Sequence, residues 1–233
     1  MKIIDNLIRC FYPDRCLICK NILEIERNRG ICKNCEENTQ GCDIRYIDLS
    51  FERENEIISE KVYCISAFYL TGKIKKMIYA YKFNEKTSYA ELFASEMNIK
   101  LKKELPNAAA DFDYVTYIPL SKKDKSKRGY DQSELICKKF SKYSGVKLKR
   151  LLAKVKDNKV QHQLTASQRQ ENVIGVYKAI NEKFIKGKKI ILCDDIVTTK
   201  STLKEGCKEL FKAGASEIIC VTATTTEYKS KWE

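Results

Sequence analysis

The chain has 233 residues, enough for one ordinary domain and a smaller one, and it is 43% hydrophobic and 32% charged. No apolar run approaches the roughly 20 residues of a membrane helix, and charged residues near the start argue against a secretory signal. We therefore expect a cytoplasmic protein with no membrane span. The net charge of +13 favours polyanionic partners such as nucleic acid, nucleotides or phosphorylated sugars, with solubility alone as the alternative explanation.

Cysteines are concentrated at the start of the chain, where residues 1–45 contain six of the eleven. An odd number of cysteines in a cytosolic chain favours metal ligation over disulfides. Two C-x2-C pairs separated by twelve residues supply four thiolates, the ligand set of tetrahedral zinc: Cys16, Cys19, Cys32 and Cys35. Four thiolates leave no open coordination position, so we expect structural zinc in a small N-terminal module; Cys10 and Cys42 are left out of the ligand set.

The rest of the chain is predicted to form a larger α/β domain over residues 60–233. Residues 48–61 are rich in Glu and Asn and are interpreted as a linker or a peripheral turn. Apolar β-branched runs then alternate with stretches of helical period. The expected elements are a strand at Val62–Leu70, helices at Lys73–Lys82 and Ala90–Lys102, and a strand at Tyr114–Pro119.

A basic loop is expected after the second strand, followed by a helix that begins near Asp131. Asp131 and Glu134 have capping-box spacing, and Gly145 supplies a stop signal. These signals continue the alternation of strands and helices.

The last third of the chain is predicted as strand, turn, helix and strand. The strands are expected at Lys188–Cys193 and Glu217–Thr222, with a helix at Leu203–Ala213 closed by Gly214. Thr202 and Glu205 have the spacing of a capping box for that helix. Such a unit implies a parallel strand pair, so the loop after the first strand opens at the carboxyl edge of the sheet, where ligands bind in open α/β folds.

Two adjacent carboxylates, Asp194 and Asp195, end the first of these strands. They are costly to bury unsatisfied, so they are expected to face hydroxyls, a metal ion or cations. Four hydroxyl residues follow just before the helix N-terminus, where free amides and the helix dipole attract phosphate: Thr198, Thr199, Ser201 and Thr202. The combination outlines a ribose-5-phosphate site; the alternative is a polar turn before a capped helix.

This segment resembles the phosphoribosyl pyrophosphate (PRPP) signature of type I phosphoribosyltransferases. The resemblance implies a mostly parallel sheet flanked by helices, with PRPP bound together with Mg2+. It implies that Asp194 and Asp195 hold the ribose 2- and 3-hydroxyls and that Thr198–Thr202 wraps the 5-phosphate. Lys200 stands where that family usually has Gly, which adds a Cβ and a cation within the phosphate loop.

Two further segments resemble ComF proteins. Pro119–Ser121 with Arg128-Gly129-Tyr130-Asp131-Gln132 is similar to their P-L-S … R-G-F-N-Q segment, which implies that Arg128 and Gly129 lie on the pyrophosphate side of the site. The lysines between the two parts suit pyrophosphate or a nucleic-acid backbone, and a solvated basic loop explains the lysines about as well.

The second segment is similar to a ComF pattern in the region of a mobile hood over the substrate. Its matching residues are Gln161, Leu164, Thr165, Arg169, Asn172, Gly175 and Tyr177. His162, the one histidine of the chain, is either a base or a loop residue without a task.

Together the matches run from Cys16 to Thr202 and resemble the ComF family over most of the chain. ComF membership implies a cytoplasmic role in DNA uptake and natural transformation, with single-stranded DNA and DNA-uptake proteins as partners. Two alternatives remain open: an active phosphoribosyltransferase with an unknown acceptor, and a zinc-stabilised nucleic-acid adaptor whose degenerate site is suggested by Lys200.

Overall fold

The computed structural model describes residues 12–24, 30–39, 45–84, 86–156 and 174–226. Its strands are β1 (Arg45–Arg53), β2 (Glu56–Tyr69), β3 (Tyr114–Tyr117), β4 (Lys147–Leu148), β5 (Leu152–Lys154), β6 (Tyr177–Ala179), β7 (Lys189–Val197) and β8 (Glu217–Thr225). Its helices are α2 (Lys33–Thr39), α3 (Gly72–Phe83), α4 (Tyr89–Glu104), α5 (Ala108–Asp111), α6 (Lys122–Arg128), α7 (Gln132–Ser144), the 3-10 turn η2 (Glu182–Phe184) and α9 (Ser201–Lys212). Within these ranges, no helix combines the length and apolar character that crossing a membrane requires.

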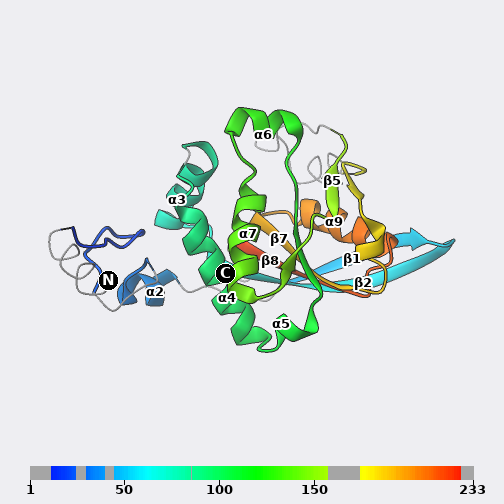
Figure 1. Ribbon diagram of the computed structural model, residues 1–233, viewed down its shortest axis with the longest axis horizontal. Helices are drawn as coiled ribbons and strands as arrows, with labels where there is room; N and C mark the ends of the chain where they lie inside the picture. Colours follow the sequence, from blue (N-terminus) through cyan, green and yellow to red (C-terminus); the bar gives the residue numbers. More distant parts are fainter. Residues whose placement is uncertain (1–11, 25–29, 40–44, 85, 157–173, 227–233) are drawn as a thin grey trace, which may run out of the picture.

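A six-stranded sheet in the order β1-β2-β8-β7-β3-β4 forms the centre of the molecule (Figure 1). β2, β8, β7, β3 and β4 run parallel to one another, and β1 at the edge of the sheet pairs antiparallel with β2. Parallel strands covered on both faces are apolar throughout, as in β7, where Ile190–Cys193 are all buried. The predicted α/β class with a mostly parallel sheet is therefore confirmed.

Two apolar layers cover the two faces of the sheet. Successive residues of β7 point to opposite faces, and Ile191 joins the layer formed with α3, α4 and α7, whereas Ile190 joins the layer formed with α9. On α9, Leu203, Cys207 and Leu210 recur at helical spacing and are buried against the sheet. The burial of this stripe fixes α9, and with it the loop that precedes α9, on the sheet.

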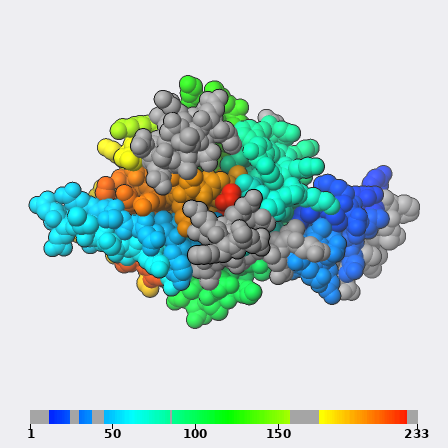
Figure 2. All heavy atoms as spheres, turned by 180° about the vertical axis from the view of Figure 1, so that it is seen from behind, coloured from blue at the N-terminus to red at the C-terminus, as the bar shows by residue number. Residues whose placement is uncertain are grey.

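The cysteine-rich segment packs against the helical side of the larger unit. Cys16, Ile18 and Ile31 belong to the same apolar cluster as Ile78 of α3 and Phe93 of α4. Figure 2 shows this segment protruding at one end of the molecule and the β1–β2 hairpin protruding at the other. The segment therefore shares a core with the helices beside the sheet.

Residues 48–61 were interpreted above as a linker, and this prediction is wrong. They form most of β1 and the start of β2, and Glu54 and Asn55 make the turn with φ of 54° and 66°. Ile47, Leu49 and Phe51 alternate with polar residues and face the core, but the polar outer face conceals this period of two. The expected domain start at residue 60 lies within β2.

Two local predictions also need correction. The basic loop after β3 is the helix α6, because Ser121 caps it by accepting a hydrogen bond from the Asp124 amide. Thr202 and Glu205 do not form a capping box, because α9 begins at Ser201 and the Glu205 carboxylate accepts from the Gly175 amide instead.

The helix predicted to begin near Asp131 is confirmed as α7. Asp131 is its N-cap and accepts a hydrogen bond from the Glu134 amide, and Gly145 ends it with a φ of 79°.

Candidate functional site

The acidic pair lies at the carboxyl end of β7, in the middle of the sheet. Asp194 and Asp195 are buried, each with 7% of its surface exposed. Asp194 Oδ1 accepts hydrogen bonds from the hydroxyl of Ser133 at 2.8 Å and from the amide of Asp195 at 2.8 Å. Ser133 lies in the first turn of α7, so the start of this helix contacts the end of β7.

A lysine from α3 neutralises the second carboxylate of the pair. Lys82 Nζ lies 2.9 Å from Asp195 Oδ1, and both side chains are largely shielded from solvent. The main-chain oxygen of Asp195 also accepts from the Thr224 hydroxyl of β8 at 3.2 Å. A buried carboxylate with a cation and strand contacts is held in one orientation.

The pKa of Asp194 is raised to about 7. Burial is the main cause, followed by the negative charge of Asp195, while Lys82 and the hydrogen bonds from Ser133 and the Asp195 amide act in the opposite direction. Two carboxyl groups this close do not both ionise readily without further compensation. The arrangement therefore favours a ligand that brings hydroxyl donors or cations to the pair.

The loop after β7 leads directly into the N-terminus of α9. The hydroxyls of Thr199 and Ser201 lie 2.9 Å apart, and the helix has no side-chain cap. First-turn amides and the positive end of the helix dipole attract an anion. The structure thus brings the predicted hydroxyl residues and the acidic pair to the same edge of the sheet.

Lys200 is accommodated without filling this loop. It adopts the left-handed conformation, with φ of 62°, that Gly takes without strain. Its ammonium donates to the main-chain oxygen of Tyr46 on β1 at 2.7 Å. The side chain therefore reaches the edge strand β1, and the left-handed turn expected of a Gly is retained.

Arg128 and Gly129 are connected to the acidic pair through the start of α7. Arg128 donates to the Gln132 side chain at 3.1 Å, and Gly129 ends α6 in the left-handed conformation with φ of 75°. Gln132 precedes Ser133, the residue that contacts Asp194. Asp131 also accepts from the Leu120 amide, which explains why the two ComF-like parts of this segment occur together.

Most of the second ComF-like segment lies outside the described residues. This holds for Gln161, His162, Leu164, Thr165, Arg169 and Asn172, and also for Cys10 and Cys42. Of the two described residues, Gly175 donates its amide to Glu205 of α9 and Tyr177 is buried. The pKa of Tyr177 is raised, first by burial and then by the negative charges of Asp194 and other nearby carboxylates.

Two residues of the site, Lys82 and Ser133, were missed by the sequence analysis. Lys82 belongs to a helix with four lysines, and no local pattern distinguishes it from the other three. Ser133 follows the ComF-like Arg128–Gln132 segment and was a detectable extension of it. Both reach the acidic pair only through the tertiary fold, which brings α3 and α7 beside the end of β7.

The four cysteines of the two C-x2-C pairs form a cluster. The sulfur atoms of Cys16, Cys19, Cys32 and Cys35 all lie within 4.8 Å of one another. The amides of Cys19 and Cys32 each approach the Cys16 sulfur at 3.4 Å. Four sulfurs at these separations fit a tetrahedral ion with bonds of about 2.3 Å.

The surroundings of two of these thiols shift their pKa values in opposite directions. Burial raises the pKa of Cys16, but hydrogen bonds from the amides of Cys19, Cys32 and Ile18 outweigh this and bring the pKa to about 6. Burial and the neighbouring thiols raise the pKa of Cys35. Thiolates this close repel one another unless a cation holds them, so the cluster can hold a metal ion such as zinc.

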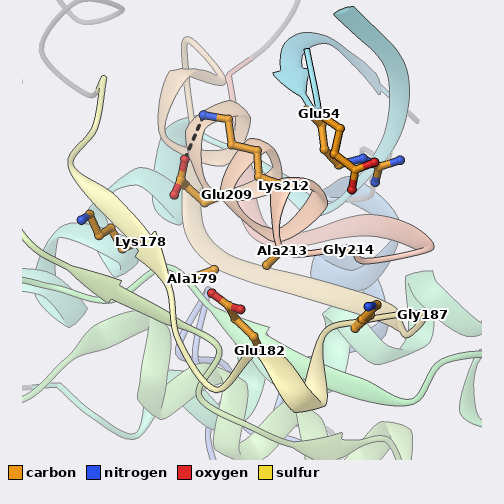
Figure 3. A pocket seen from close by; sticks show the side chains of 11 residues that line it. Glu54, Lys178, Ala179, Glu182, Gly187, Glu209, Lys212, Ala213 and Gly214 are labelled. Atoms are coloured by element: carbon orange, nitrogen blue, oxygen red, sulfur yellow. Dashed lines mark hydrogen bonds and ion pairs between the residues drawn. The ribbon is translucent and has the colours of Figure 1, made fainter. Parts of the chain in front are cut away.

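A separate pocket of about 690 Å3 lies at the opposite, amino edge of the sheet (Figure 3). It is bordered by Gly187 before β7 and Gly214 before β8. Its charged lining is mixed: Arg53, Lys178, Lys186 and Lys212 against Glu54, Glu182 and Glu209. Such a mixture produces no strong field of one sign, so this pocket is a weaker candidate for a phosphorylated ligand than the acidic pair and its loop.

The chain is similar to one family of domains and to two named proteins. Residues 125–231 match the family model described as a phosphoribosyl transferase domain. Competence protein F of Haemophilus influenzae is 25% identical over 89% of this chain and 95% of its own length. The DNA utilization protein YhgH of Salmonella typhi is 28% identical over 46% of each chain.

Among solved structures, the allosteric regulatory enzyme of purine biosynthesis is similar over 57% of this chain and 25% of its own, with 21% identity and a TM-score of 0.38. The parallel sheet and the matched region define a phosphoribosyl transferase-type α/β domain. Together with the N-terminal four-cysteine cluster, these matches make the chain similar to competence protein F and YhgH, the ComF/YhgH family.

Proposed function

We propose that this protein binds PRPP at the carboxyl edge of its sheet. The observation that carries the proposal is the buried acidic pair beside the uncapped N-terminus of α9. Asp194 and Asp195 accept hydrogen bonds from the ribose 2- and 3-hydroxyls, and residues Thr198–Thr202 surround the 5-phosphate with amides and hydroxyls. Arg128 and Gly129 lie on the pyrophosphate side.

Magnesium enters this site with the ligand. In the absence of ligand, the Lys82 ammonium already forms an ion pair with Asp195, so the site is not arranged for a resident divalent ion. When bound, Mg2+ would be held by the pyrophosphate of PRPP and would supply positive charge beside it. The residues of this chain hold the ribose and its phosphate, and Lys82 limits the repulsion between the carboxylates.

The test is a calorimetric titration of PRPP with Mg2+ into the zinc-loaded protein. Wild type is expected to bind, and Asp194→Asn and Asp195→Asn are each expected to weaken binding by at least about tenfold, because each removes charge-assisted hydrogen bonds worth about 1.5–3 kcal/mol. Asp113→Asn is the matched control, since Asp113 carries an ion pair with Lys188 at the amino edge.

The outcomes separate the proposal from its alternatives. If wild type does not bind PRPP, the chain is a zinc-stabilised adaptor with a degenerate site. If it binds and releases pyrophosphate with an acceptor nucleophile, it is an active phosphoribosyltransferase. Binding without release with any acceptor supports a protein that senses or carries PRPP.

The N-terminal cysteine cluster is proposed as a structural zinc module that precedes β1, and the phosphoribosyltransferase-like domain, expected over residues 60–233, is proposed to begin with β1 at Arg45. Four thiolates saturate zinc, so the ion has no position for a substrate. The apolar residues around the cluster join the core of α3 and α4, which supports a stabilising role.

We further propose a role in DNA uptake or DNA use in the cytoplasm, with single-stranded DNA and DNA-uptake proteins as partners. The support is the resemblance to competence protein F along nearly the full length of both chains, together with the net charge of +13. Binding to single-stranded DNA is expected to weaken steeply as salt rises, and a flat salt response would remove DNA from the partners.

A further inference from the structure

The positive charge of this chain is concentrated on two helices. α3 contains four lysines and no acidic residue, and α6 contains four lysines, an arginine and Asp124. These 19 residues therefore carry a net charge of +8, whereas the whole chain carries +13. A local charge of this size attracts an anionic polymer.

Exposed aromatic rings accompany this charge. Tyr79 and Phe83 lie one turn apart on α3, with 42% and 51% of their surfaces exposed and their ring centroids 5.9 Å apart. The Arg128 guanidinium at the end of α6 lies 5.2 Å from the Phe83 ring centroid. Arg128 and Phe83 thus join the two helices into one surface of cations and accessible rings, called here the α3–α6 surface.

The α3–α6 surface adjoins the candidate PRPP site. Phe83 directly follows Lys82, whose ammonium contacts Asp195. Gln132 links the two helices: its side chain accepts from Arg128 and donates to the main-chain oxygen of Lys82 at 3.4 Å. A ligand on the α3–α6 surface therefore lies next to the elements that hold the acidic pair.

We propose that the α3–α6 surface binds single-stranded nucleic acid, with an unpaired base stacked on Phe83 and phosphates on the surrounding lysines. Partly exposed rings beside cations suit unstacked bases, whereas the bases of a duplex are hidden between their neighbours. Lys75, Lys76, Lys122 and Lys123 are exposed and supply the phosphate contacts. The inference rests on the DNA-binding part of the proposed function and names its surface.

The stacking contact is tested by fluorescence anisotropy with a labelled oligothymidylate of about 20 nucleotides. Phe83→Leu keeps an apolar side chain and removes the ring, so we expect binding to weaken roughly 5- to 150-fold, the effect of losing one base stack. Tyr63→Leu is the matched control, because Tyr63 also belongs to an exposed pair, with Tyr46, on the β1–β2 hairpin. With an abasic oligonucleotide, Phe83→Leu and wild type are expected to bind equally.

The phosphate contacts are tested through the salt dependence of the same binding. Lys75→Glu with Lys76→Glu is expected to reduce the slope of log K against log salt by about 1.4 for a single strand. Lys178→Glu with Lys186→Glu makes the same charge change at the amino-edge pocket and is expected to leave the slope nearer to that of wild type.

Three results would overturn the inference. Phe83→Leu could bind the oligonucleotide as tightly as wild type, or Tyr63→Leu could lose as much affinity as Phe83→Leu. Alternatively, Phe83→Leu could weaken binding to phosphatidylserine vesicles and leave DNA binding unaffected. If wild type binds no oligonucleotide, the DNA part of the proposed function fails as well. PRPP titration is a separate measurement, so the two failures remain distinguishable.

Discussion

Asp194 couples the candidate site to pH. Its pKa is raised to about 7 in the folded chain, mainly by burial and then by Asp195. The folded state therefore prefers the protonated form more than the unfolded chain does. The resulting stability is fully present below the ordinary pKa of an Asp side chain and is lost as the pH rises towards 7.

We expect Asp194→Asn to remove this pH dependence. The melting temperature of wild type minus that of the variant should fall between about pH 4 and about pH 7, the interval between the ordinary and the raised pKa. Subtracting the variant cancels other titrations, including those of the cysteines. Asp113→Asn is expected to give a small difference of opposite sign, because Lys188 lowers the pKa of Asp113. A flat difference for Asp194→Asn would contradict the raised pKa.

We expect that Lys82 keeps the acidic pair from acting as a free metal site. Replacing it by Met removes the cation 2.9 Å from Asp195 and leaves two adjacent carboxylates without it. We expect Lys82→Met to bind Mn2+ at least about tenfold more tightly than wild type in the absence of PRPP, because local negative charge attracts the ion. Electron paramagnetic resonance of free Mn2+ measures this directly.

The control for the Lys82 experiment is Lys139→Met. Lys139 pairs with Glu91 at 2.6 Å on the surface, so its loss removes an equal charge away from the acidic pair. Unchanged Mn2+ binding in Lys82→Met, or an equal gain in Lys139→Met, would show that Lys82 does not guard the pair. The double variant with Asp195→Asn is expected to lose the gain.

At the scale of elements, the unit from β7 to β8 was predictable because three independent signals agree. Ile190–Cys193 form a continuous apolar run, Leu203–Leu210 have helical spacing, and Gly214 ends the helix. The β1–β2 hairpin was not predictable, because its outer face and its turn are polar, as the sequence of a linker is. Likewise, the acidic pair was found because its residues are adjacent in sequence, whereas Lys82 reaches it only through tertiary packing.

Lys200, at the start of α9, has a strained left-handed backbone. The effect of this strain on stability can be measured separately from that of the Lys200 hydrogen bond to Tyr46. Lys200→Ala removes the hydrogen bond to Tyr46 and keeps a Cβ in the left-handed conformation, whereas Lys200→Gly also relieves the strain. We expect the Gly variant to be more stable than the Ala variant by about 1 kcal/mol, the cost of this conformation for an L residue. Urea unfolding measures the difference.

The two Lys200 variants also test whether the lysine contributes to ligand binding. Because its ammonium lies on β1, both variants are expected to retain PRPP affinity close to that of wild type. A large loss of affinity in both would show that Lys200 turns to the phosphate when the ligand binds. An Ala variant as stable as the Gly variant would contradict the strain assigned to this turn.

At the scale of the whole molecule, the cysteine cluster and the candidate PRPP site are connected by packed helices. Cys16 and Cys35 share an apolar cluster with α4, and α4 packs against α3, which carries Lys82. We therefore expect loss of order in the cysteine cluster to disturb the position of Lys82, which contacts Asp195. The cysteine cluster and the candidate site are thus supported by one apolar core.

Removal of the metal is expected to lower the stability of the whole chain. Cys35→Ser should lose bound zinc and melt at least about 4 °C lower than wild type, since a loss of 2 kcal/mol lowers Tm by about 4–8 °C at this length. A strong chelator should lower the Tm of wild type towards that of Cys35→Ser and leave the variant unchanged, which separates loss of metal from loss of a buried thiol. Elemental analysis of both proteins gives the zinc content. If Cys35→Ser keeps its zinc and its Tm, the cluster is a set of ordinary buried thiols, and the helices beside the sheet owe their stability to apolar packing alone.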